Sequence, residues 1–163
     1  MLAYWYRFRQ LLDFYRHAVT KYQIHSPFVS ELVNEVLEDD RWYYAFRDIE
    51  QLRNQMLHSD VKLEVLDFGA GTLSPEKGEG GTLRKVSLRD LAVRAASSPA
   101  QGRALFRLAN HLAPKTILEL GASTGIGAMY LASAVRSAKV ATLEGCPECA
   151  RVARAHFDLL GLK

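Results

Sequence analysis

Two acids flank a segment bearing glycines near the end of this 163-residue sequence. Glu119 precedes Gly121 and Gly125 in the stretch ELGASTG, and Glu144 follows Gly125 by 19 residues. Glycines let the backbone bend sharply and let a ligand approach without interference from a Cβ atom. A carboxylate at the end of the next strand can accept hydrogen bonds from both ribose hydroxyls of an adenosine. The pattern predicts a nucleoside site, whereas a pyrophosphate prefers a closer G-x-G-x-x-G turn with no acid beside it.

The elements around these residues alternate between strand and helix. We expect strands over residues 116–120 (TILEL) and 140–144 (VATLE), separated by a helix over residues 126–135 that is rich in Ala, Leu and Met. Pro147 suits the first position of another helix, and Gly161 suits its C-terminal cap. This βαβα order is typical of parallel strands joined by right-handed crossovers. It places both acids at the edge of the sheet where open α/β folds bind their ligands.

The first part of the chain shows helical spacing. Six apolar residues recur at steps of three and four, which places them on one stripe of a helix: Trp5, Phe8, Leu12, Tyr15, Val19 and Tyr22. We expect this stripe to pack on another helix rather than to lie on a membrane. Ser26 and Pro27 fit the cap and first position of a second helix.

The expected fold class is α/β. A helical N-terminal extension (1–58) is followed by a strand, a loop and helices that lead into the core (59–115). Residues 116–163 form the first half of a Rossmann-like, doubly wound parallel sheet, which we expect to be truncated. Helices are predicted over 88–96 and, after Ser98 and Pro99, up to Pro114.

ELGASTG resembles the first motif of class I S-adenosylmethionine-dependent methyltransferases, with Ser123 where many members have the middle glycine. Residues 140–144 resemble their second motif. Residues 98–105 (SPAQGRAL) and 149–161 further resemble the catechol and caffeoyl-CoA type of O-methyltransferase. The resemblance covers about residues 97–163. It implies a small-molecule O-methyltransferase that uses S-adenosyl-L-methionine.

The resemblance also implies roles for particular residues. The backbone of the turn would border the methionine part of the cofactor, and Glu119 would help to hold that end. Glu144 would bind the ribose, with Gly145 and Cys146 beside the adenosine. The turn that would border the methionine part comprises Gly121, Ala122, Ser123, Thr124 and Gly125.

This chain departs from the resembling subgroup just after the turn. Many members have an aromatic residue and then a serine there, and the serine contacts the cofactor carboxylate, whereas this chain has Ile126 and Gly127. The resemblance implies seven strands, of which residues 116–163 supply two. The catalytic base and the ligands of any divalent metal are therefore expected beyond residue 163, so we expect the chain alone to be inactive.

Two other motifs in the sequence are candidate functional sites. Asp67-x-Gly69-x-Gly71 also has an acid and glycines, but a polar segment (74–81) follows it in place of a helix, which favours a turn at the edge of the fold. Cys146 and Cys149 form a C-x-x-C pair, which redox proteins and zinc sites also use. No second cysteine pair accompanies it, so we interpret it as packing at the start of a helix and expect no metal site.

Composition limits the partners. A formal net charge of +3 is too small to indicate nucleic acid. No apolar run approaches the roughly 20 residues that cross a bilayer, so a cytoplasmic protein without a membrane partner is expected. Sheet edges left open by the missing strands favour a homo-oligomer. Two alternatives to the methyltransferase remain open. One is a non-enzymatic helical interaction module with a degenerate Rossmann remnant, and the other is a dinucleotide-binding domain.

Overall fold

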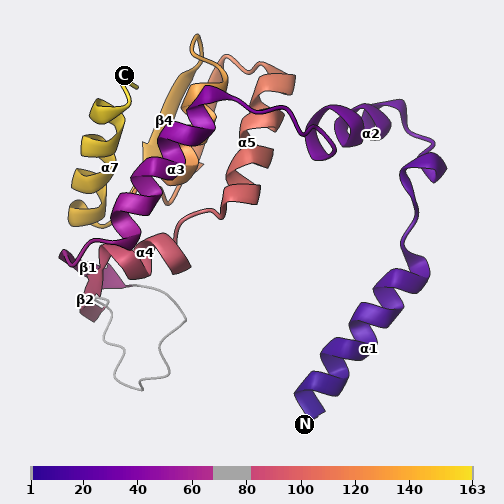
Figure 1. Ribbon diagram of the computed structural model, residues 1–163, viewed down its shortest axis with the longest axis horizontal. Coiled ribbons are helices and arrows are strands. Elements are labelled where there is room, and N and C mark those ends of the chain that lie inside the picture. Colours follow the sequence, from indigo (N-terminus) through magenta and orange to yellow (C-terminus); the bar gives the residue numbers. More distant parts are fainter. Residues whose placement is uncertain (1, 68–81, 163) are drawn as a thin grey trace. The chain divides into compact units, whose positions relative to one another are not determined.

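The computed structural model describes residues 2–67 and 82–162 (Figure 1). The chain divides into two compact units, Met1–Asp39 and Asp40–Lys163. The first unit is helical, and the second combines helices with two small sheets. The chain is therefore of mixed α/β composition, and the two units are described separately below.

The first unit begins with helix α1 (Leu2–His17), which is followed by the 3₁₀ turn η1 (Lys21–Gln23). The predicted stripe is thus shorter than expected, because Val19 and Tyr22 lie beyond the end of α1. The backbone N–H of Thr20 donates to the side chain of Gln23, which starts the new turn and separates it from α1. The stripe side chains within α1 are exposed, Trp5 by 70% and Phe8 by 52%.

Helix α2 (Pro27–Leu32) begins at the predicted residue. The Ser26 hydroxyl oxygen accepts a hydrogen bond from the Val29 N–H, and Pro27 occupies the first turn, where its missing N–H has no helical partner. A wider π-helical turn, η2 (Val33–Leu37), continues it and buries Val36.

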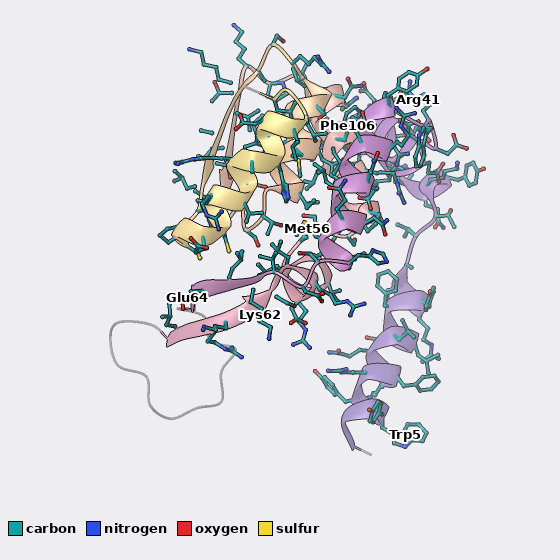
Figure 2. All side chains as sticks on the ribbon, turned by 60° about the vertical axis from the view of Figure 1, so that its left-hand side comes forward. Trp5, Arg41, Met56, Lys62, Glu64 and Phe106 are labelled. Atoms are coloured by element: carbon teal, nitrogen blue, oxygen red, sulfur yellow. The ribbon has the colours of Figure 1, made fainter. Side chains whose placement is uncertain are left out.

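Helix α3 (Tyr44–Leu57) belongs to the second unit, although the sequence grouped residues 1–58 as one extension. Its apolar side chains recur every three or four residues and pack against α5 (Pro99–Leu112) and α6 (Ile126–Ala134). Figure 2 labels Met56 and Phe106 in this region. The core cluster consists of Phe46, Ile49, Leu52, Met56, Ala92, Phe106, Ile126, Met129 and Tyr130.

A partly buried polar network joins α3 to α6. The Tyr130 hydroxyl donates to Glu50 Oε1 at 2.7 Å, and Arg53 Nε donates to Glu50 Oε2 at 2.8 Å. The Arg53 guanidinium also donates to the carbonyl of Ser97 at 2.6 Å. A Cβ atom on Gly102 of α5 would lie 2.3 Å from the Tyr130 ring, so only glycine lets the ring pack there. These contacts fix the helix that starts at the glycine turn.

Strands β3 (Thr116–Leu120) and β4 (Lys139–Leu143) pair in parallel with α6 as their crossover, as predicted. Leu120 pairs with Leu143, so both carboxyl ends lie at one edge of the sheet. Helix α7 (Pro147–Leu159) follows, with Pro147 in its first turn. Strand β4 ends one residue earlier than expected, and Glu144 comes directly after it.

Strand β1 (Lys62–Asp67) lies in a separate sheet, whose pairing the sequence analysis left unpredicted. It pairs antiparallel with β2 (Thr82–Ser87), a strand that the sequence analysis did not predict. The sheet content is therefore not purely parallel. Helix α4 (Leu88–Arg94) starts directly after β2, where the Ser87 hydroxyl oxygen accepts from the Asp90 N–H. Leu63 is buried in a second small core with Leu91, Cys146 and Cys149.

The β3–β4 pair leaves apolar side chains in solvent. Leu118 is 63% exposed, Leu120 72% and Leu143 59%, and along each strand they alternate with partly buried residues. The side chains that alternate with them include Glu119, which approaches the first turn of α6. In the described ranges 2–67 and 82–162, we find no helix with the length and apolarity needed to cross a membrane.

Candidate functional site

The segment between β3 and α6 is a tight turn with three left-handed residues. Gly121 has φ +88°, Ser123 has φ +50° and Gly125 has φ +86°. The Gly121 N–H donates to the carbonyl of Leu143 at 2.8 Å, which ties the turn to the end of β4. Ser123 is the strained member, because a left-handed conformation costs a residue with a Cβ roughly 1–2 kcal/mol.

Glu144 holds this strained turn from the neighbouring strand. Its Oε2 accepts from the Ser123 N–H at 2.6 Å, and its Oε1 accepts from the Cys146 N–H at 2.8 Å. One carboxylate thus joins the glycine turn to the start of α7. Each carboxylate oxygen has two lone pairs, so each can still accept a hydrogen bond from a ligand.

Glu119 lies on the α6 side of the sheet. Thr142 of β4 donates its hydroxyl to Glu119 Oε2 at 2.6 Å. A Cβ atom on Gly127 would lie 2.6 Å from Glu119 Oε1, so the missing side chain of Gly127 provides the room for this carboxylate. This finding gives a physical reason for the glycine where the resembling subgroup has serine.

The pKa of Glu119 is raised above its usual value. Burial is the main cause, the nearby charge of Glu144 adds to it, and the hydrogen bond from Thr142 opposes it. The amino end of α6 carries a partial positive charge that favours an anion at this position. Glu119 and Glu144 thus bring two acidic side chains to one edge of the sheet, an arrangement that attracts a positively charged group.

The outer side of the turn is open. Apart from each glycine and its two chain neighbours, no described atom lies within 4 Å of the position where a Cβ atom on Gly121 or Gly145 would stand. Ala122 and Thr124, by contrast, turn their side chains inward, and Thr124 is fully buried. A ligand can therefore approach Gly121 and Gly145, whereas the Thr124 side chain faces the protein.

The C-x-x-C pair is buried at the start of α7. Cys146 and Cys149 are free thiols with 4% and 3% exposure, and Cys146 Sγ lies 3.6 Å from the carbonyl oxygen of Glu64. Burial raises the pKa of Cys149 to about 12, with a further contribution from its hydrogen bond with Cys146. The interpretation of Cys149 as a packing residue on the core face is confirmed. Among the residues that the structure describes, no group of three or more potential ligands could hold a metal ion.

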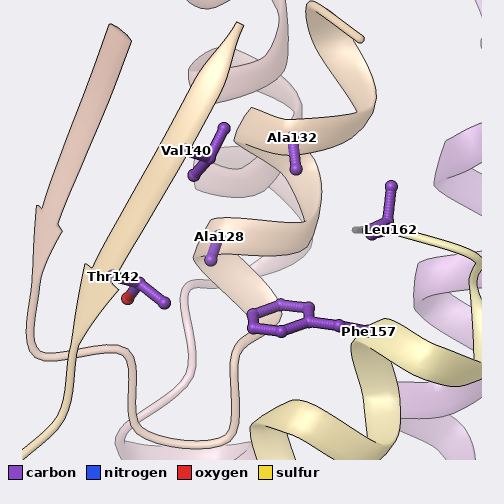
Figure 3. A pocket seen from close by; sticks show the side chains of 6 residues that line it. All are labelled: Ala128, Ala132, Val140, Thr142, Phe157 and Leu162. Atoms are coloured by element: carbon purple, nitrogen blue, oxygen red, sulfur yellow. The ribbon is translucent and has the colours of Figure 1, made fainter.

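A small apolar cavity of about 70 Å³ lies between α6, β4 and α7. Figure 3 shows Val140 and Thr142 on β4 with Phe157 of α7 among its lining side chains. A cavity of this volume is too small for a nucleoside. Phe157, which also lies behind Gly125, links this cavity to the inner side of the turn.

The sequence analysis missed two residues at this site. Thr142 was visible only as part of a predicted strand, and its partner Glu119 lies 23 positions away. His156 of α7 places Nδ1 2.9 Å from the Thr124 carbonyl oxygen, across 32 positions of sequence. No local pattern could have indicated either contact. Gly69 and Gly71 of the competing motif lie outside the described residues.

Comparisons with known proteins add little to this geometry. No protein-family model matches the sequence, and no curated protein matches it. Among solved structures, the chain is similar to a methyltransferase of Podospora anserina with bound SAH, at 17% identity and a TM-score of 0.49. The match covers 89% of this chain and 48% of that one, so the chain spans about half its length. Similarity at this level leaves the function to be argued from the site itself.

Proposed function

We propose that residues 116–162 bind S-adenosyl-L-methionine and that the protein is a methyltransferase that uses it. One observation carries the proposal, which is that Glu119 and Glu144 stand at adjacent carboxyl ends of parallel strands, on either side of a left-handed turn. S-adenosylmethionine carries an ammonium and a sulfonium group, which two carboxylates attract. A pyrophosphate would be repelled by the same pair, which weighs against the dinucleotide alternative.

The residues present fit this ligand. Space beside Gly121 and Gly145 leaves the backbone accessible on the outer side of the turn. Glu144 is already fixed by two backbone N–H groups, so its remaining lone pairs are oriented before a ribose arrives. Glu119 would face the ammonium group, whose charge would offset the repulsion between the two acids.

The chemistry that this cofactor supplies when bound is an activated methyl group on sulfur. The role of the chain's own residues is to bind and orient it, since alignment can supply roughly 7–11 kcal/mol of the barrier. We propose an oxygen of a small molecule as the acceptor, which would need a base or a divalent metal to lower its pKa. Neither is assigned to a described residue.

The proposal extends to self-association and location. The exposed Leu118, Leu120 and Leu143 offer a surface for a second copy of the chain. Light scattering over a dilution series would show a concentration-dependent dimer, and a monomer at every concentration would contradict this part. Two free thiols suit a reducing compartment such as the cytoplasm.

The rival function is a helical interaction module without a ligand, which the exposed aromatic residues of α1 favour. Calorimetry with a matched panel separates the possibilities: S-adenosylhomocysteine, adenosine and NAD share the adenosine group. We expect affinity to fall in that order. Glu144→Ala should weaken binding by more than about tenfold, while Glu148→Ala, a change at an exposed acid paired with Arg151 on α7, should leave it unchanged. No binding of any member would contradict the proposal, and tightest binding of NAD would favour the dinucleotide alternative.

A further inference from the structure

The inner side of the glycine turn rests against helix α7. His156 Nδ1 lies 2.9 Å from the carbonyl oxygen of Thr124. A carbonyl oxygen can accept but not donate, so Nδ1 carries the hydrogen of this bond. The bond joins the last turn of α7 to the residue that precedes Gly125.

Apolar packing accompanies this hydrogen bond. A Cβ atom on Gly125 would lie 3.1 Å from the Ala153 Cβ and 3.2 Å from the Phe157 ring, so the backbone of the turn lies directly on α7. The Thr124 hydroxyl is buried and has no hydrogen-bond partner among the described residues. The carbonyl of Thr124 is therefore the polar group of this residue that α7 holds.

The turn is thus held from two sides by groups of opposite polarity. The Glu144 carboxylate accepts from the Ser123 N–H on one side, and the His156 ring donates to the Thr124 carbonyl on the other. The two contacts fall on consecutive residues: Ser123, which is left-handed, and Thr124, which precedes the left-handed Gly125. A strained conformation persists where surrounding contacts over-determine it.

We propose that His156 is a positioning residue that holds the glycine turn in its ligand-binding conformation. It acts through the Thr124 carbonyl and touches no ligand itself. The effect on the turn stands on the geometry alone, while the effect on affinity rests on the proposed function. His156→Leu removes the donor, and His156→Asn restores an N–H at the same number of bonds from Cα. Arg154→Gln alters an exposed side chain of the same helix as a control.

The first measurement is amide hydrogen exchange by NMR without ligand. In His156→Leu we expect exchange at Ser123 and Gly125 to rise about 3- to 10-fold, the range that one lost hydrogen bond permits. His156→Asn and Arg154→Gln should match the wild type. Unchanged exchange in a folded His156→Leu, or equal acceleration in His156→Asn, would overturn the proposal. If His156→Leu does not fold, His156→Ala takes its place in the same comparison.

The second measurement is the dissociation constant of S-adenosylhomocysteine. We expect about 3- to 10-fold weaker binding in His156→Leu and wild-type binding in His156→Asn. An unchanged constant alongside faster exchange would overturn the claim that the turn's conformation sets affinity. Failure of the wild type to bind would contradict the proposed function, and the exchange measurement would still decide the role of His156.

Discussion

The two strand pairs of the second unit begin from similar sequences and reach different geometries. In each case an acid at or near the end of a short strand, Asp67 in β1 or Glu119 in β3, is followed within six residues by two glycines. Strand β1 pairs antiparallel with β2, so Asp67 at its carboxyl end lies opposite Thr82 at the amino end of β2. Strand β3 pairs in parallel with β4, so Leu120 lies opposite Leu143.

On the proposed function, this difference in strand topology is what distinguishes the acid and glycines after β3 from those after β1. A helical crossover returns the chain to the starting end of the sheet, so the next strand runs parallel and its last residues reach the same edge. Glu119 and Glu144 reach the same edge of the sheet in this way. In an antiparallel pair the second strand brings its first residues to that edge, here Thr82 opposite Asp67.

Among the substitutions considered, we expect the largest loss of folding free energy at Gly125. Gly125→Ala places a Cβ atom in a left-handed conformation and 3.1 Å from Ala153, which together should cost about 2–3 kcal/mol of folding free energy. Thermal unfolding measures this cost. Gly121 has a similar φ, but beyond its chain neighbours no described atom lies within 4 Å of the added Cβ, so Gly121→Ala should cost about 1 kcal/mol. Equal costs at both positions would contradict the packing of α7 against the turn.

Glu144→Ala should have the next largest effect. It leaves the N–H groups of Ser123 and Cys146 without their acceptor, at a cost of roughly 1–2 kcal/mol in stability. Affinity for S-adenosylhomocysteine should fall by more than about tenfold, since the ribose acceptor is lost as well. Gly145→Ala is the complementary change. It meets no described atom within 4 Å, so it should weaken binding without lowering the melting temperature.

The sequence predicted the parallel part of the fold well because its signals are local. The run of β3, turn, α6, β4 and α7 was placed to within about a residue, with Pro147 and Gly161 marking the ends of α7. The pairing of β1 with β2 was not predicted for two reasons. Strand β2 (TLRKVS) is short and polar, and it is separated from β1 by a long stretch of sequence. Helix α3 was grouped with the extension, although Phe46, Ile49 and Met56 carry the spacing of a core helix.

Glu119→Gln is expected to separate stability from binding. The folded-state pKa of Glu119 is raised, mainly by burial, so its ionised form costs stability at neutral pH and this cost is lost as the pH falls through the folded pKa. Glu119→Gln should therefore melt at a higher temperature than the wild type at neutral pH. This difference should shrink as the pH is lowered toward 4.5, the ordinary value of the group. Binding of S-adenosylhomocysteine should weaken several-fold, because the ammonium group loses its charged partner. A Glu119→Gln protein that binds as well as the wild type would exclude Glu119 from the site.

Asp67→Asn should have the smallest effect. Because β1 belongs to the antiparallel pair, its carboxyl end meets the amino end of β2, where Thr82 stands opposite Asp67. The dissociation constant of S-adenosylhomocysteine should therefore stay within about twofold of the wild type, a smaller change than the loss of one hydrogen bond produces. A loss as large as that of Glu144→Ala would place the ligand at the hairpin and reverse the comparison.

The most direct test of the central claim is an NMR titration of the isotope-labelled protein with S-adenosylhomocysteine. The proposed site lies at the carboxyl ends of β3 and β4, so the largest shift changes should fall on the amides of residues 119–125 and 144–146. The amides of β1 and β2 away from α7 should move little. Changes centred on residues 62–67 and 82–87, or none at saturating ligand, would contradict the assignment of the site to the parallel pair.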